Sequence, residues 1–445
     1  MKLTGMRAFT VVWAGQVLSL LGTGMSRFAL AVWAYQITGE ATALALVAFF
    51  SVLPAILASP VAGVLVDRWN RKLVMMLSDL LAGVATIGVL ILHLSGGLEV
   101  WHLYVAAAFA GVGEAFQWPA YSAAISTMLR KEQYGRADGM LGLASAASEI
   151  LSPFLAGALL AVVGLGGVLV VDIVTFLIAI TALAIVVIPR PAVTEFGKAA
   201  AGSFTQQALY GFRYIWQRPS LFGLLMVFLA ANFIFNLAFV PLVPMILART
   251  GGNEQLLGIV QSVGAVGGAV GGLWMSLWGG PRRKVVGYLA PMIVSATLGS
   301  MLLGLAQSPI IWAFAIFCET LVSPIMMGSQ QAIWQAKVAP DIQGRVFAAR
   351  RMLGYFSAPV ALLIAGPLAD RVFAPSMAPG APLGQALGGL LGTGDGAGLG
   401  LMMIVFGFFG VFVGIGGFLT PAIRDAETLL PDHDQPAEVA FQAAG

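Results

Sequence analysis

Long apolar stretches separated by short polar segments form the dominant pattern along this chain. Each stretch is long enough to cross a hydrocarbon core of about 30 Å as a helix. Most of them contain Pro or Gly, which membrane helices tolerate. The pattern predicts an all-α membrane protein with twelve transmembrane helices. The predicted spans are residues 9–34, 41–65, 73–94, 100–128, 139–163, 167–188, 220–247, 256–279, 286–306, 309–335, 351–373 and 399–421.

A short pattern recurs in the fourth and tenth predicted spans. Glu114 is followed five residues later by Pro119, and Glu319 is followed in the same way by Pro324. The two copies are 205 residues apart (319 − 114), close to half the length of the chain. The repeat predicts two six-helix bundles with pseudo-two-fold symmetry about the membrane normal, an arrangement typical of transporters.

Breaks in the apolar pattern define the expected domains. They are an N-terminal six-helix bundle at 1–190, a cytoplasmic linker with an amphipathic helix at 191–219, a C-terminal six-helix bundle at 220–422, and a disordered cytoplasmic tail at 423–445. The linker prediction depends on apolar residues that fall on one helical face after Ser203. The tail is predicted to be disordered because it is acidic and poor in apolar residues.

The composition and the positions of the cations set the class and the orientation. Hydrophobic residues make up 59% of the chain and charged residues only 10%, which excludes an ordinary soluble domain. Of the 23 Lys and Arg residues, all but Arg27, Arg249 and Arg371 fall at the N-terminus, in even-to-odd loops or in the tail. The positive-inside rule then predicts a multi-pass protein with both termini cytoplasmic. We expect it in a bacterial-type inner (plasma) membrane, where a proton gradient is the natural energy source.

Several kinds of chemistry and partner are not expected. The cations lie in separate short loops, so no nucleic acid is expected to bind. The three histidines are scattered and the one cysteine is Cys318, so no metal site and no intrachain disulfide are predicted. The chain has no ATP-binding P-loop. We therefore expect no enzyme activity, no cofactor and no ATPase subunit, and we expect a monomer in the lipid bilayer that uses a proton gradient as its energy source.

The turn after the second predicted span carries the most specific motif. It resembles the G-x-x-x-D-R-x-G-R-R/K signature of the major facilitator superfamily, whose fold would give the two bundles. Asn70 stands where that pattern has Gly, and a turn with positive φ would tolerate either residue. Asp67 is expected to latch an inner gate, whereas anchoring to the inner leaflet is favoured for Lys72. The gating motif comprises Gly63, Asp67, Arg68, Asn70, Arg71 and Lys72.

Weaker motifs resemble the twelve-span drug:proton antiporters of this superfamily, which include macrolide-efflux and siderophore-export proteins. They cover about residues 1–422 and include Gly22-Thr23-Gly24, Gly135-Arg136-Ala137-Asp138 and Gly344-Arg345-Val346-Phe347. The resemblance implies secondary active transport by alternating access, with the fourth and tenth spans lining a central cavity.

Ionisable groups inside the predicted spans are candidates for proton coupling, because a charge in hydrocarbon costs at least about 2.5–3.5 kcal/mol. The candidates are Glu114, Glu149, Glu319 and Asp172. Glu114 ranks first because of its depth, and a structural role is favoured for Asp172. A structural pairing of these acids with Arg27 is left open, as is an anionic substrate for Arg27. Asp79 is interpreted as structural, within reach of loop cations.

Polar and aromatic side chains at other span positions are candidates to line the substrate cavity, although helix packing explains each of them individually. They are Gln16, Arg27, Gln117, Trp118, Asn232, Phe233 and Asn236. A wide apolar cavity with few polar groups suits a bulky amphiphilic small molecule such as a drug, an antibiotic or a secondary metabolite. The alternatives are an exporter of a siderophore or a lipid-like substrate and, less favoured, a nutrient importer or a non-transporting scaffold or receptor.

Overall fold

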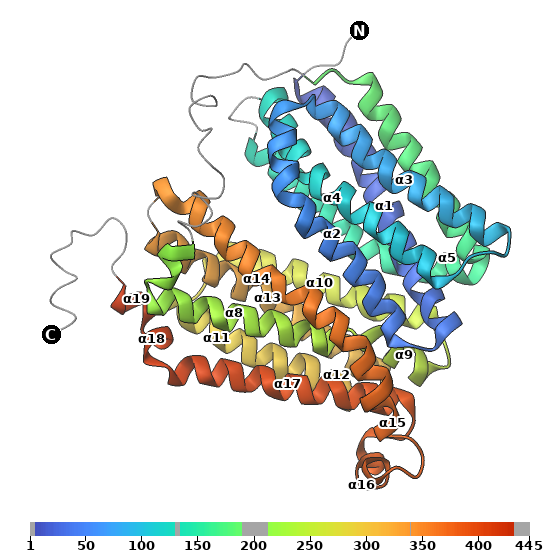
Figure 1. The fold of residues 1–445 in the computed structure, drawn as a ribbon, viewed down its shortest axis with the longest axis vertical. Helices are drawn as coiled ribbons and strands as arrows, with labels where there is room; N and C mark the ends of the chain where they lie inside the picture. Colours follow the sequence, from blue (N-terminus) through green and yellow to red (C-terminus); the bar gives the residue numbers. More distant parts are fainter. Residues whose placement is uncertain (1–4, 130–133, 189–211, 339, 431–445) are drawn as a thin grey trace. The chain divides into compact units, whose positions relative to one another are not determined.

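The computed structural model describes residues 5–129, 134–188, 212–338 and 340–430. Helices make up the regular structure of this part of the chain (Figure 1). The chain divides into two compact units. Unit 1 contains residues 1–192 and 246–262, and unit 2 contains residues 193–245 and 263–445. The division differs from the predicted domains by assigning residues 246–262 to unit 1.

Unit 1 is built mainly from five long helices. They are α1 (Gly5–Thr38), α2 (Ala41–Arg68), α3 (Arg71–Leu94), α4 (Val100–Met128) and α5 (Tyr134–Ile185). Helix α5 holds both the fifth and the sixth predicted spans. The chain turns between them at Gly164, whose φ of 65° and ψ of −175° are readily available only to glycine.

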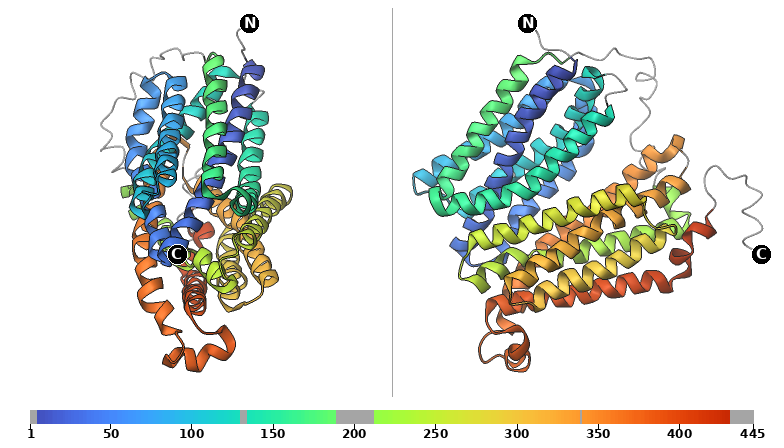
Figure 2. Two further views of the ribbon diagram at one scale, coloured as in Figure 1. Left: turned by 90° about the vertical axis from the view of Figure 1, so that its right-hand side faces the viewer. Right: turned by 180° about the vertical axis from the view of Figure 1, so that it is seen from behind.

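Unit 2 contains longer helices and several short ones, in which two π-helical segments interrupt the α-helical geometry. Helix α17 lies along α8 and α11 (Figures 1 and 2). The elements are α8 (Pro219–Phe239), α9 (Leu242–Thr250), α10 (Glu254–Trp278), α11 (Lys284–Val294), η2 (Ser295–Met301), α12 (Leu302–Leu305), α13 (Pro309–Lys337), α14 (Pro340–Leu368), η3 (Ala369–Phe373), α15 (Ala374–Ser376), α16 (Pro382–Leu391), α17 (Asp395–Leu419), α18 (Pro421–Arg424) and α19 (Ala426–Leu429). The C-terminal part of α9 and the start of α10 belong to unit 1.

Ten helical stretches of the described residues are long and apolar enough to cross a membrane. One of these, Met140–Ile185, contains the turn at Gly164 and therefore corresponds to two predicted spans. Helix α4 coincides with the fourth predicted span. The prediction of an all-α, multi-pass membrane fold with twelve spans is confirmed.

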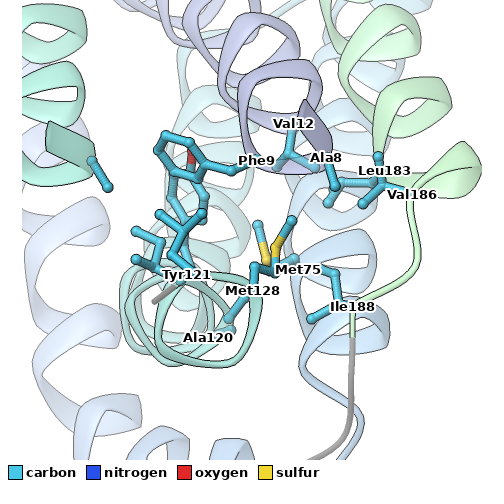
Figure 3. Packing of buried hydrophobic residues seen from close by; sticks show 14 of the residues in the cluster. Ala8, Phe9, Val12, Met75, Ala120, Tyr121, Met128, Leu183, Val186 and Ile188 are labelled. Atoms are coloured by element: carbon cyan, nitrogen blue, oxygen red, sulfur yellow. The ribbon is translucent and has the colours of Figure 1, made fainter. Parts of the chain in front are cut away.

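Close packing holds the helices together, because lipid is as apolar as the helix surfaces and supplies no hydrophobic driving force between them. In unit 1, Phe9, Met75 and Leu183 are fully buried in one cluster with Tyr121 (Figure 3). Small residues allow the backbones to approach. A Cβ on Gly111 of α4 would overlap a carbonyl oxygen of α2, so only glycine fits this crossing.

The end of the chain differs from the prediction of a disordered tail from residue 423. Residues 421–430 form α18 and α19, and Ile423 and Ala426 are buried. Contacts with α11 and α13 order this segment, although its composition is polar. Residues 431–445 lie outside the described residues, as do residues 189–211, which include most of the predicted amphipathic linker; residues 212–216 of that linker are helical.

Candidate functional site

Glu319 in α13 is a deeply buried acid, with 5% of its surface exposed. Its Oε1 accepts a hydrogen bond from the Ser295 hydroxyl at 2.7 Å, and its Oε2 has no hydrogen-bond partner among the described residues. Ser295 begins the π-helical segment η2, in which Gly299 lies so close to Oε2 that a Cβ there would overlap it. Single π-helical turns within α-helices are frequent at functional sites.

Glu114 occupies the same place in the repeat as Glu319 but has different surroundings. Its Oε2 lies 3.8 Å from Nη2 of Arg27, and the two side chains are 66% and 69% exposed within the described structure. An ion pair this exposed contributes about 0–1 kcal/mol in water. The pairing of Arg27 with an intramembrane acid, left open by the sequence, is thus realised with Glu114.

Asp79 in α3 joins two of the predicted cavity residues. The Gln16 side-chain amide donates to its Oδ2 at 2.9 Å, and the Gln117 amide donates to its Oδ1 at 2.9 Å. Gln117 also donates to the Gln16 carbonyl at 3.1 Å. The carboxyl is therefore held by neutral amides from α1 and α4 instead of the loop cations that the sequence suggested. Its surface is only 9% exposed.

Asp172 in α5 is surrounded by hydroxyl groups from neighbouring helices. Thr23 of α1 donates to Oδ1 at 3.2 Å, and Thr86 of α3 donates to Oδ2 at 3.1 Å. Asp172 is 4% exposed. Glu149 is different, since it lies on an exposed face of α5 and forms no ion pair with a described residue.

The predicted cavity residues of the seventh span lie on α8. The Asn232 side-chain amide donates to the carbonyl of Phe228, and that of Asn236 donates to the carbonyl of Asn232, at 3.2 and 2.8 Å. Both bonds stay within α8 and leave the side-chain oxygens available. Phe233 is half-buried on the same helix. The side chain of Trp118 lies outside the described residues.

Asn70 and Lys72 in the loop 2–3 motif have clear structural roles. Asn70 has a φ of −68°, so the predicted positive φ is wrong. It instead caps α3, since its side chain accepts from the amide of Lys72 at 3.0 Å. The Lys72 ammonium donates to the carbonyls of Ala184 and Val186 at 2.8 Å each, at the end of α5. Arg71 begins α3. Gly63, Asp67 and Arg68 lie in the last turns of α2, and the side chains of Asp67 and Arg68 lie outside the described ones.

Arg350 falls in a predicted loop, just before the eleventh predicted span at 351–373. Helix α14 begins at Pro340, earlier than the predicted eleventh span, and places Arg350 well inside a helix. Its guanidinium donates to the side-chain oxygens of Gln330 and Gln331 at 2.9 Å each and lies 5.0 Å from the centre of the Trp334 ring. The polar pair Gln330-Gln331 late in an apolar span was the signal that could have revealed it.

A family model places this fold among known proteins. The model described as Major Facilitator Superfamily matches residues 12–362. The chain belongs to the major facilitator superfamily. It is a transporter and not an enzyme, as the sequence predicted.

Individual members of the superfamily are similar along most of the chain. Macrolide efflux protein A of Streptococcus pyogenes is 27% identical over 369 residues, covering 82% of this chain and 90% of that protein. Multidrug efflux pump Tap of Mycolicibacterium fortuitum is 27% identical over 361 residues, covering 78% of this chain and 86% of that protein.

Solved structures support the same fold at lower sequence identity. A bacterial homologue of the human lysosomal transporter Spinster, in an inward-facing and unoccupied conformation, has a TM-score of 0.71 at 17% identity and covers 93% of this chain and 97% of its own. A bacterial homologue of the iron transporter ferroportin has a TM-score of 0.65 at 13% identity, covering 93% of this chain and 99% of that protein.

Proposed function

We propose that this superfamily member exports a bulky amphiphilic small molecule, such as a drug, an antibiotic or a secondary metabolite, by proton-coupled alternating access. The observation that carries the proposal is the similarity to macrolide efflux protein A and multidrug efflux pump Tap over more than three quarters of the chain. A siderophore or a lipid-like compound is the alternative substrate class. The protein acts as a monomer in a bacterial-type inner membrane, with both termini in the cytoplasm.

The proton is carried by an acid inside the membrane. Glu319 is the strongest candidate, because its carboxyl is buried beside one hydroxyl and no described cation neutralises it. A buried ionised carboxylate without a partner costs several kcal/mol, so a bound proton is the natural counterpart in the resting state. Glu114 is the second candidate, since protonation would break its pair with Arg27 and so change the charge of that pair.

Transport in liposomes tests the proposal. Purified protein is reconstituted, a pH gradient is imposed, and uphill movement of a radiolabelled macrolide is followed. Glu319→Gln should abolish uphill transport but retain downhill exchange, because the amide preserves volume and the acceptor for Ser295 but cannot exchange a proton. Ser376→Ala is a suitable control, since that hydroxyl bonds only to Phe373 of its own chain segment.

The outcomes of the transport assay decide between the candidate acids, the energy source and the substrate classes. Uphill transport by Glu319→Gln at the wild-type level would exclude Glu319 and move the test to Glu114→Gln. Wild-type transport that ignores the pH gradient would refute proton coupling. Absence of any macrolide transport, with transport of a siderophore instead, would favour the alternative substrate class. The orientation is tested in a Cys318→Ser background by labelling Lys284→Cys, which should react only from the cytoplasmic side.

A further inference from the structure

Asp172 lies at the centre of a group of oxygen atoms contributed by three helices of unit 1. The hydroxyls of Thr23 in α1 and Thr86 in α3 contact opposite oxygens of its carboxyl. The hydroxyl of Ser26, one helical turn beyond Thr23, also lies against the carboxyl. Ser26 is 4% exposed and its Oγ has no well-formed hydrogen bond with any described residue. Helix α5 packs against both α1 and α3 in this unit (Figure 1).

The charge of this group is not balanced by any described side chain. No described Lys or Arg forms an ion pair with Asp172, and Arg27, one turn from Thr23, pairs with Glu114. Burying an isolated carboxylate is unfavourable, so a positive charge is required beside it when it is ionised. One carboxylate among neutral hydroxyls matches a single positive charge, whereas a divalent ion would leave an excess charge of one in the membrane interior.

The oxygen–oxygen distances in the group are longer than those of strong direct hydrogen bonds to a carboxylate. Hydroxyl groups that donate to a carboxylate usually lie about 2.5–2.7 Å from it, whereas Thr23 and Thr86 lie 3.2 and 3.1 Å from the carboxyl oxygens. Calcium, which is close to sodium in radius, binds oxygen at about 2.3–2.6 Å, so adjacent ligands of a six-coordinate ion are about 3.3 Å or more apart. The two hydroxyls therefore lie slightly closer to the carboxyl than they would around a bound ion, and a small outward shift of each would admit one. Each hydroxyl also keeps lone pairs that can face a cation.

The depth of the group in the membrane is appropriate for an ion site. Thr23 lies near the middle of α1 (Gly5–Thr38), and Thr86 lies in the middle part of α3 (Arg71–Leu94). Coupling ions in secondary transporters bind near the bilayer midplane. Gly22 permits the close approach of α1, because a Cβ there would overlap the Thr175 hydroxyl of α5.

We propose that Asp172, Thr23, Thr86 and Ser26 form a binding site for a monovalent metal ion of the size of Na⁺ within unit 1. The carboxylate supplies the charge, and the three hydroxyls supply neutral oxygen ligands. The proposal concerns ion binding and does not depend on the substrate that the protein exports or on proton coupling.

Direct binding of ²²Na⁺ to the purified full-length protein tests the site. Wild type should bind Na⁺ saturably, and its thermal unfolding temperature should rise in NaCl but not in choline chloride. Asp172→Asn should abolish saturable binding. Thr86→Val, which removes one oxygen at nearly constant volume, should weaken binding on the order of tenfold because the number of ligands sets the affinity. Thr181→Val is the matched control on α5, since its hydroxyl bonds only to the carbonyl of Leu177.

The outcomes separate this proposal from its competitors. If Asp172→Asn fails to fold, Thr86→Val and Ser26→Ala decide the question in its place. No saturable ²²Na⁺ binding by wild type, or equal binding by wild type and Thr86→Val, overturns the proposal and leaves a proton as the partner of Asp172. Proton-driven macrolide transport would be unaffected by that failure, so the two proposals fail separately.

Discussion

The contact between Glu427 and the start of α11 gives a prediction with a magnitude. The Glu427 carboxylate accepts from the backbone amides of Lys284 and Val285 at 3.0 and 2.9 Å. These are the first residues of α11 (Lys284–Val294), whose amides have no partner within the helix. The segment is further held by the Lys337 ammonium, which donates to the carbonyls of Glu427 and Leu430 at 2.6 and 2.5 Å.

Glu427→Ala removes the cap and the negative charge at the positive end of the helix dipole. Loss of a side-chain cap costs about 0.5–2 kcal/mol, and loss of the charge costs about 0.3–1 kcal/mol. We therefore expect the free energy of unfolding of unit 2 to fall by about 1–3 kcal/mol. For a unit of this size, the unfolding temperature should fall by about 2–12 °C. Glu427→Gln keeps one acceptor oxygen and should show about half the effect.

Thermal unfolding of the purified protein in detergent, followed by tryptophan fluorescence, measures the effect. Two truncations of the chain complete the experiment, one as a control and one as a stronger test. Ending the chain after Leu430 should leave the unfolding temperature unchanged, whereas ending it after Thr420 should lower it more than Glu427→Ala does, because the buried Ile423 is lost as well. An unfolding temperature of Glu427→Ala equal to that of wild type would refute the reasoning and reduce α18 and α19 to passive contacts.

Three further predictions test other parts of the molecule. Asp67→Asn should retain membrane insertion but strongly reduce transport, and wild-type transport would reduce its loop to an anchor. Gly22→Ala should destabilise unit 1 by about 1–3 kcal/mol because its Cβ would overlap a hydroxyl of α5, whereas Gly88→Ala, with open space around its Cα, should be neutral in the same melts. The hydrogen-bonded Arg424 guanidinium lowers the pKa of Asp425, so their stabilisation should be present above an unfolded pKa of about 3.9 and be lost as pH falls through the lower folded pKa; a melting difference between Asp425→Asn and wild type that does not shrink as the pH is lowered below about 3.9 would contradict this.

The fold was predictable because the apolar stretches are long and sharply bounded, and membrane spans depend mainly on length and hydropathy. The surroundings of individual residues were harder to predict from the sequence. Glu114 and Glu319 are equivalent in the sequence repeat, but one is exposed beside Arg27 and the other is enclosed by η2. Which face of a helix meets which neighbour depends on tertiary packing, and a π-helical segment changes that face without a sequence signal.

The polar ends of the helices were predictable in position but not in role. Lys72 was expected to anchor the inner leaflet, and the structure shows it binding the last carbonyls of α5. Asn70 was explained by an unusual backbone conformation, and it proves to be an ordinary helix cap. The Asn70 cap could have been recognised, because Asn is a preferred residue before the first turn of a helix and its partner is two residues away. The partners of Lys72 are backbone carbonyls more than a hundred residues away, so residue identity alone could not reveal them.

The neutralisation of the buried acids links stability to ions in solution. Asp79, Asp172 and Glu319 are each nearly enclosed, and no described side chain forms an ion pair with any of them. Whatever neutralises each acid in the folded state, a proton or a metal ion, stabilises that state in proportion to its binding. An amide variant removes the charge at one acid only. If the proposals hold, Asp172→Asn should remove the dependence of the unfolding temperature on NaCl, and Glu319→Gln should leave that dependence intact. Loss of the Na⁺ response in Glu319→Gln with retention in Asp172→Asn would reverse the assignment of the two ions.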